Sequence, residues 1–206
     1  MNSILLLHGA LGSASQLRPL KDALEHEGIS VFTLDFSGHG GRDFANTFGI
    51  EQFSEELGEF FRKNHPQSFD IFGYSMGGYV ALYHAAHDAV QIGTIMTLGT
   101  KFDWTPEKAM AEVKKLDPEK IRDKVPGFAK MLETRHQPND WTLLLRKTSA
   151  MMLSLGERPL VSTGDLKKIS VPVRIAVGDV DDVVDRARSA DVASILCSGT
   201  FQILSD

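Results

Sequence analysis

The chain has 206 residues, which suits one domain with its own core, and 42% hydrophobic with 24% charged residues exclude a wholly disordered chain. Its 22 basic and 27 acidic residues give a net charge of −5, which argues against a nucleic-acid-binding protein, because such proteins carry a basic surface. Cys197 is the one cysteine and cannot form an internal disulfide; we expect it to be a small buried side chain. With no basic leader and no run of 18 apolar residues, we expect a cytoplasmic protein that binds a small molecule and no membrane.

Short apolar runs predict the strands of a sheet. They lie at residues 4–7, 31–34, 69–72, 92–98, 171–177 and 200–204. Continuous apolar runs are typical of strands that are buried on both faces in parallel sheets. Apolar residues at helical spacing predict intervening helices over 17–24, with Ser15 as N-cap, and over 50–61, 79–86 and 187–193. This alternation predicts a mostly parallel, doubly wound α/β sheet.

Residues 105–164 carry no strand pattern and predict a helical insertion. Helices are expected to begin at Pro106 and Asp140, and Pro118 and Pro126 are expected to break the region into short pieces. We therefore expect a discontinuous core, residues 1–104 and 165–206, with residues 105–164 as an inserted cap. The methionines and tryptophans of this region either line an adaptable apolar pocket or dock the helices on the sheet; they are Trp104, Met110, Met131, Trp141, Met151 and Met152.

The sequence Gly73-Tyr74-Ser75-Met76-Gly77 lies between a predicted strand and a predicted helix. In this context a Gly-x-Ser-x-Gly motif is typical of a nucleophile elbow, a sharp turn that strains the serine backbone and exposes its hydroxyl group. Small residues at 73 and 77 allow the strand and the helix to approach closely. The helix N-terminus favours negative charge beside the hydroxyl group, so the motif predicts that Ser75 is a nucleophile.

The loop His8-Gly9-Ala10-Leu11-Gly12 follows the first predicted strand, at the same end of the sheet as Ser75. A glycine-rich loop in this place can turn a backbone N–H toward a reacting carbonyl oxygen. We expect the N–H groups of Ala10 and Met76 to form an oxyanion hole. His8 itself is expected to brace the loop rather than to act as a base.

Three acidic residues follow the fifth predicted strand and its Gly178. Of Asp179, Asp181 and Asp182, we favour Asp181 as a catalytic acid, because the third position after the glycine clears the end of the strand. The other two are expected to cap a helix or to face solvent. Asp103, after the fourth strand, remains an alternative acid.

Together these motifs resemble the α/β-hydrolase superfamily. The resemblance covers the chain outside residues 105–164, where that family carries its variable cap, and implies the α/β-hydrolase fold. It implies Ser75 as nucleophile, Asp181 as the orienting acid, and Ala10 and Met76 as oxyanion donors, without a metal or an organic cofactor. An esterase- or lipase-like enzyme that cleaves a small ester or related acyl bond is the first expectation. The fold does not choose among esterases, thioesterases, C–C hydrolases, lyases and peroxidases, nor does the sequence give the oligomeric state.

The base of the implied triad is missing from this chain. In the α/β-hydrolase superfamily it is a histidine after the last strand, but all seven histidines precede Asp181: His8, His26, His39, His65, His84, His87 and His136. We expect the chain to be truncated before this histidine. The alternative is a non-catalytic small-ligand-binding protein on the same scaffold. Substitution by His39 or His136 would require a different chain order.

Overall fold

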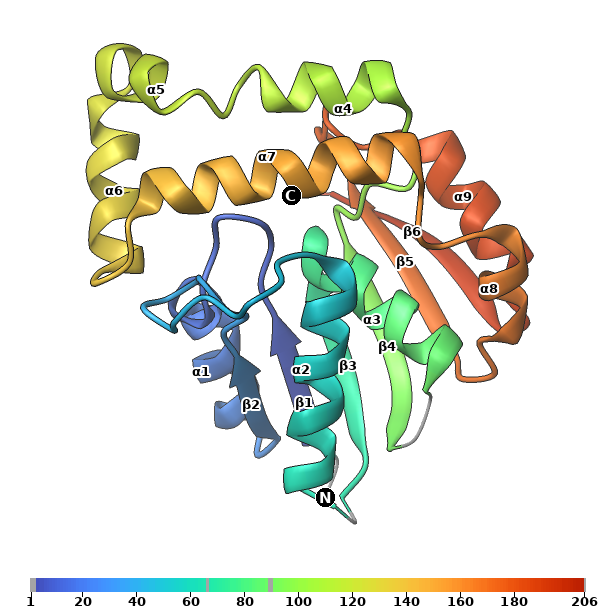
Figure 1. Ribbon diagram of the computed structural model, residues 1–206. Helices are drawn as coiled ribbons and strands as arrows, with labels where there is room; N and C mark the ends of the chain where they lie inside the picture. The colour runs from blue at the N-terminus through green and yellow to red at the C-terminus, as the bar shows by residue number, and fades with distance from the viewer. Residues whose placement is uncertain (1–2, 66, 89–90, 206) are drawn as a thin grey trace.

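The computed structural model describes residues 3–65, 67–88 and 91–205, and these contain a six-stranded sheet (Figure 1). The strands lie in the order β2-β1-β3-β4-β5-β6, and each neighbouring pair is parallel. Their bounds are β1 Ser3–Leu7, β2 Ser30–Leu34, β3 Phe69–Tyr74, β4 Ile92–Leu98, β5 Val173–Gly178 and β6 Gly199–Leu204. The predicted parallel, doubly wound sheet is confirmed, and all strand carboxyl ends meet at one edge.

Helices cover the two faces of the sheet unequally. A layer on one face consists of α2 (Ile50–Lys63), α3 (Met76–His87), α8 (Thr163–Lys168) and α9 (Arg186–Ile195). A short 3₁₀ helix, η1 (Ala14–Leu17), leads into α1 (Arg18–His26) on the opposite face (Figure 1).

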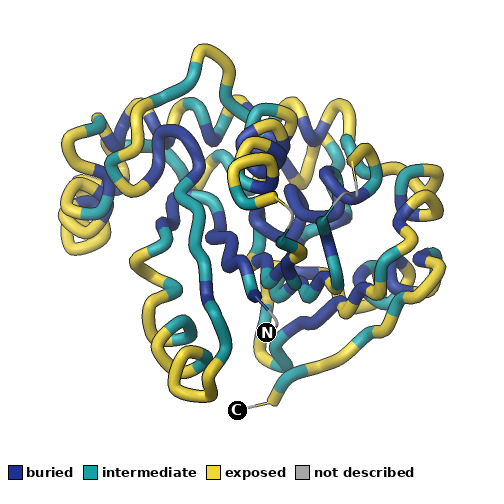
Figure 2. Tube along the Cα trace, turned by 90° about the horizontal axis from the view of Figure 1, so that it is seen from below, coloured by how far each residue is buried: buried dark blue, intermediate teal, exposed yellow. Residues whose placement is uncertain are grey.

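The main core lies between the α2–α3 layer and the sheet, and buried residues gather along the central strands (Figure 2). Phe53 and Leu57 of α2 and Val80 of α3 are fully buried there against Leu5 and Ile71. Each such burial contributes about 1.5–3 kcal/mol to folding.

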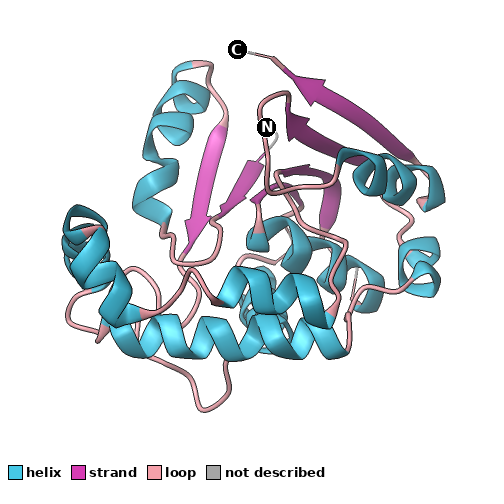
Figure 3. Ribbon diagram, turned by 90° about the horizontal axis from the view of Figure 1, so that it is seen from above, coloured by secondary structure: helices cyan, strands magenta, loops and turns pink. Residues whose placement is uncertain are grey.

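Of the five helices between β4 and β5, the first four, which we call the cap helices, lie beyond the carboxyl ends of the strands (Figure 1). Seen from above, the longest of them runs across the molecule on the α2–α3 side of the sheet (Figure 3). The cap helices are α4 Pro106–Val113, α5 Pro118–Lys124, α6 Pro126–His136 and α7 Trp141–Glu157. Three of them, α5, α6 and α7, share a hydrophobic cluster with Leu11 of the loop after β1, which we call the cap core; it includes Ile121, Leu132, Trp141, Leu144 and Leu145. That residues 105–164 form a separate unit stays a prediction.

Pro118 and Pro126 divide this region into short helices, as expected, and each begins one, because the first helical position needs no N–H and accepts the fixed φ of proline. Other local predictions were wrong. Ser15 lies inside η1 and does not cap α1, which begins at Arg18. Helix α8 was not predicted, and Cys197 is exposed. Within the part of the chain that the structure describes, no helix is long and apolar enough to cross a membrane.

Candidate active site

Ser75 lies at the turn between β3 and α3, with φ 51° and ψ −115°. A positive φ is rare for a residue with a side chain and costs on the order of 1–3 kcal/mol. Hydrogen bonds hold this backbone on both sides. The Ser75 N–H donates to the Leu98 carbonyl at 2.8 Å, and the Thr100 hydroxyl donates to the Ser75 carbonyl at 2.9 Å. Ser75 therefore has the strained strand-to-helix geometry that the motif predicted. The supporting role of Thr100 was not predicted, because no motif surrounds this residue and its position just after β4 was the only signal.

Glycines allow the backbone segments around Ser75 to approach closely. A methyl group on Gly73 would lie 2.5 Å from the Gly78 Cα. One on Gly77 would lie 2.5 Å from the Leu7 carbonyl oxygen and 2.8 Å from that of His8. The first helical turn of α3 therefore rests directly on the end of β1.

We expect Gly77→Ala to destabilise the fold, because the three atoms that its methyl group would strike, the Leu7 carbonyl carbon and oxygen and the His8 carbonyl oxygen, are backbone atoms that cannot rotate away. The expected cost is about 3 kcal/mol, equivalent to a fall in Tm of about 6–12 °C for a chain of this size. The matched control is Gly127→Ala in α6, where no atom lies within 4 Å of the added methyl group. It should be neutral or stabilise by up to about 1 kcal/mol. Thermal unfolding measures both, and equal Tm values for the two variants would contradict the packing described.

The loop after β1 lies against Ser75. Its tight turn is closed by the Gly12 N–H, which donates to the Gly9 carbonyl at 3.0 Å, and a methyl group on Gly9 would lie 3.1 Å from the Ser75 Cβ. Among the described residues, the backbone N–H groups of Ala10 and Met76 have no hydrogen-bond acceptor. Since Ala10, Ser75 and Met76 line one pocket, these two donors can hold a negatively charged oxygen beside the hydroxyl group.

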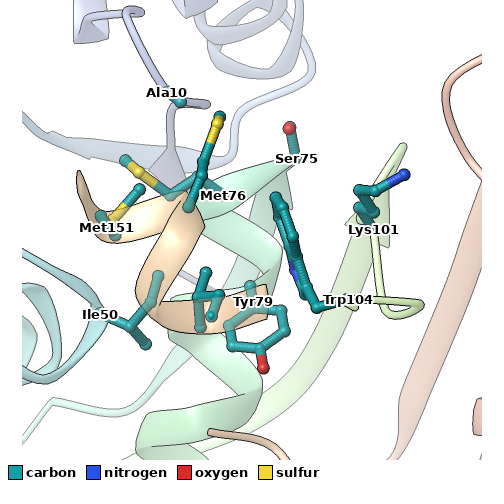
Figure 4. A pocket seen from close by; sticks show the side chains of 10 residues that line it. Ala10, Ile50, Ser75, Met76, Tyr79, Lys101, Trp104 and Met151 are labelled. Atoms are coloured by element: carbon teal, nitrogen blue, oxygen red, sulfur yellow. The ribbon is translucent and has the colours of Figure 1, made fainter. Parts of the chain in front are cut away.

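This pocket is small, with a volume of about 40 Å³, and mostly apolar. The Ser75 hydroxyl group projects between Ala10 and Lys101 in the close view (Figure 4). The remaining lining residues are Ile50, Tyr79, Trp104, Met151, Met152 and Leu155. The methionines and tryptophans were expected either to line a pocket or to dock helices, and each expectation is met by some of them. Trp104, Met151 and Met152 line the pocket, whereas Trp141 packs in the cap core. Met110 and Met131 are exposed.

Asp181 does not line this pocket but reaches the same end of β4. Its Oδ1 accepts the backbone N–H groups of Val183 at 2.9 Å and Val184 at 3.0 Å. Its Oδ2 faces Gly99, lying 3.4 Å from where a Cβ on that glycine would be. Gly99 directly follows Leu98, the residue that binds the Ser75 N–H. Oδ1 thus holds the loop that follows β5 through these two hydrogen bonds, and Oδ2 is directed toward the carboxyl end of β4.

The competing acids have other surroundings. Asp103 forms ion pairs with Lys101, at 3.5 Å, and with Lys108. Asp182 is exposed, and the backbone N–H of Asp179 donates to the Leu204 carbonyl at 2.9 Å. Of the four candidates, Asp181 is the one whose carboxylate lies within 4 Å of the place that a Cβ on Gly99 would take.

None of the seven histidines, all of which the structure describes, lines the Ser75 pocket. Both ring nitrogens of His8 are engaged: Nδ1–H donates to the Gly9 carbonyl at 2.8 Å, and Nε2 accepts from the Phe36 N–H at 3.2 Å. His8 therefore braces its loop, as expected.

His39 and His136 are fully buried near His8, and their ring centroids lie 5.8 Å apart. His39 Nδ1–H donates to the Ser37 carbonyl, and burial, followed by the effect of His8, holds its pKa well below the usual value. Burial likewise lowers the pKa of His136 to about 4. Neither side chain reaches Ser75, so the idea that one of them replaces the missing base finds no geometric support.

Metal ligands do not gather in the described ranges, where no group of three or more His, Cys, Asp or Glu side chains is arranged to hold a metal ion. The arrangement at Ser75 offers a hydroxyl group, two free N–H groups and the N-terminus of α3. These suit an acyl-transfer reaction, in which negative charge develops on one oxygen.

Comparisons with known proteins agree with this fold. The model of a protein family described as "Serine aminopeptidase, S33" matches residues 2–203. A curated relative, the 2-succinyl-6-hydroxy-2,4-cyclohexadiene-1-carboxylate synthase of Yersinia enterocolitica, is 32% identical over 81 residues. Those residues are 39% of this chain and 29% of the Yersinia protein, so the match spans less than a third of the relative.

Solved structures resemble the chain along its whole length. NosK from Streptomyces actuosus is 19% identical with a TM-score of 0.80, covering 99% of this chain and 87% of that one. A thermophilic esterase from Thermogutta terrifontis is 20% identical with a TM-score of 0.76, covering 100% and 82%. At this identity the structures establish the fold, and the family match extends over nearly the whole chain. The chain belongs to the serine aminopeptidase S33 family of α/β hydrolases.

Proposed function

We propose that this α/β hydrolase cleaves a small carboxylic ester by acyl transfer through Ser75. The observation that carries the proposal is that Ala10, Ser75 and Met76 line one mostly apolar pocket, and that the backbone N–H groups of Ala10 and Met76 have no acceptor among the described residues. The Ser75 oxygen attacks the ester carbonyl carbon, and the carbonyl oxygen, now negative, accepts both N–H groups. The base moves the serine proton to the leaving alcohol, and water then hydrolyses the acyl-enzyme by the same route.

A serine hydroxyl group needs a base, and our proposal assigns this role to a histidine other than the seven of this sequence. The placement of the seven histidines away from the Ser75 pocket supports this assignment. Asp181 Oδ2 would accept the N–H of that histidine and hold the imidazole in the tautomer that the reaction needs.

The pocket favours an ester over the substrate of an aminopeptidase, the activity that the family description names. An aminopeptidase must bind the α-ammonium group of its substrate, and a carboxylate does this best. The pocket lining as described carries one cation, Lys101, and no carboxylate. Its other side chains are mostly apolar, which suits an uncharged acyl group.

The volume of the pocket predicts a preference for short acyl chains. About 40 Å³ holds roughly three water molecules, the bulk of an acyl group of two to four carbons. In a series of 4-nitrophenyl esters, acetate to butyrate should have kcat/KM values at least about 10-fold above those of octanoate and dodecanoate. A rise through dodecanoate would contradict the assigned pocket, and binding of such esters without hydrolysis would favour a non-catalytic ligand-binding protein.

A variant pair ties this preference to the pocket. Met151→Ala removes a buried lining side chain and should shift the optimum toward longer acyl chains. Met110→Ala, at an exposed position on α4, is the control and should leave the chain-length profile unchanged.

A further inference from the structure

The loop after β1 is held from above by the cap helices. The Leu11 carbonyl accepts two hydrogen bonds from the end of α6, one from the Arg135 guanidinium at 2.9 Å and one from His136 Nε2–H at 3.0 Å. These partners are 124 and 125 residues away in the sequence. The loop itself rises from β1 toward the cap helices (Figure 1).

Leu11 adopts a backbone conformation that it would not hold alone. Its φ is 58°, in the left-handed region that costs a branched side chain on the order of 1–2 kcal/mol. Its side chain is 8% exposed and packs in the core of the cap helices with Leu132 and Trp141. The cap helices thus hold both the side chain and the carbonyl of this strained residue.

His136 has a defined tautomer that makes it a donor to Leu11. Its Nδ1 accepts the Gly40 N–H at 3.1 Å, so the proton lies on Nε2. Because burial lowers its pKa to about 4, the ring is neutral near pH 7 and can accept on one side while donating on the other. His136 therefore joins the loops after β1 and β2 under the cap.

The neighbour of Leu11 in the same turn is Ala10, a lining residue of the Ser75 pocket whose backbone N–H has no acceptor among the described residues. We propose that Arg135 and His136 are positioning residues that hold the Gly9–Gly12 turn so that the Ala10 N–H points at the developing oxyanion. This inference rests on the proposed function of Ser75. It makes the cap helices part of the catalytic geometry as well as a cover for the pocket.

The test removes or retains the two donors in the full-length protein. Arg135→Ala and His136→Leu each remove one, whereas Arg135→Lys and His136→Gln each retain an N–H that can reach Leu11. Asn139→Ala is the matched control, because Asn139 ties the same corner of the cap to the Arg42 carbonyl, at 2.7 Å, and does not touch Leu11. For each variant, kcat and KM for 4-nitrophenyl acetate are measured with Ki for a small alkyl boronic acid, which forms a tetrahedral anion on serine.

We expect each donor-removing variant to lower kcat by about 10–100-fold. Complete loss of one oxyanion donor lowers kcat by about 10²–10³-fold, and a donor that points in the wrong direction loses part of this contribution. KM should change little, and the boronate Ki should rise by the same factor as kcat falls. The donor-retaining variants should recover most of both, and Asn139→Ala should match the wild type.

Arg135 is only partly buried, so Arg135→Ala should fold even if His136→Leu does not. Unchanged kcat and Ki in folded Arg135→Ala, or an equal loss in Asn139→Ala, would overturn the positioning role while leaving Ser75 as nucleophile. A wild-type protein that neither hydrolyses the ester nor binds the boronate would overturn the proposed function, and this inference with it.

Discussion

Ser75→Ala should lower kcat for ester hydrolysis by at least about 10⁴-fold, because it removes the atom that forms the acyl-enzyme. What remains is the contribution of substrate binding and the oxyanion donors, roughly 10³–10⁴-fold over the reaction in water. KM should change little, since the hydroxyl group is a small part of the pocket lining. Steady-state kinetics of the full-length protein with 4-nitrophenyl acetate measures this loss.

The fold should survive this change. The Ser75 side chain does not cap α3, and the hydrogen bonds at this residue use its backbone N–H and carbonyl, which alanine keeps. Ser194→Ala, at an exposed position on α9, is the control for removing a serine hydroxyl group and should keep wild-type activity. A Ser75→Ala protein that retains a tenth of the wild-type kcat would show that the reaction uses another nucleophile.

Asp181→Asn should lower kcat by about 10⁴-fold while the loop keeps its shape. The asparagine carbonyl oxygen can still accept the N–H groups of Val183 and Val184, as Oδ1 does now. Its NH₂ group then takes the place of Oδ2 and presents a donor where the proposed histidine needs an acceptor. The imidazole is therefore held in the wrong tautomer, and the base is lost without loss of packing.

The control for this change is Asp182→Asn, an exposed neighbour of equal charge. It should leave kcat within about 2-fold of the wild type, because a surface charge in high dielectric contributes little. If the two variants lose activity equally, the loss reflects the charge of the loop and not the orientation of a base. Strong loss in Asp103→Asn with a functional Asp181→Asn would move the acid to the end of β4.

The sheet was predictable because short, mostly apolar runs mark its strands, most clearly in β1, where Leu5, Leu6 and Leu7 are fully buried. The edge strand β6 is more exposed, and its apolar residues still marked it. The strand at 92–98 matches β4 at both ends, and the other predicted strands lie within one to two residues of the observed bounds at each end. The helices between β4 and β5 were less predictable. A proline such as Pro118 or Pro126 is compatible both with the end of one helix and with the start of the next. The exact bounds of these helices depend on how Ile121 and Leu132 pack in the cap core.

The candidate site likewise has a part that local sequence motifs predicted and a part that they did not. The elbow at Ser75 and the turn at Ala10 are local motifs, and the register of β1 beside β3 brings them to one edge of the sheet. The contact of Arg135 and His136 with Leu11 depends on how α6 docks, across more than 120 residues of sequence. No local pattern encodes such a contact, so sequence reasoning considered His136 only as a substitute base.

The most direct test of a nucleophilic Ser75 is covalent labelling of the full-length protein with an alkyl fluorophosphonate. In this reaction the serine oxygen bonds to phosphorus, fluoride leaves, and the adduct oxygen occupies the oxyanion position. We expect one phosphonyl group per chain, located by peptide mass mapping on Ser75 and absent from Ser75→Ala. An unlabelled wild-type protein, or a stoichiometric label on any other residue, would contradict the account.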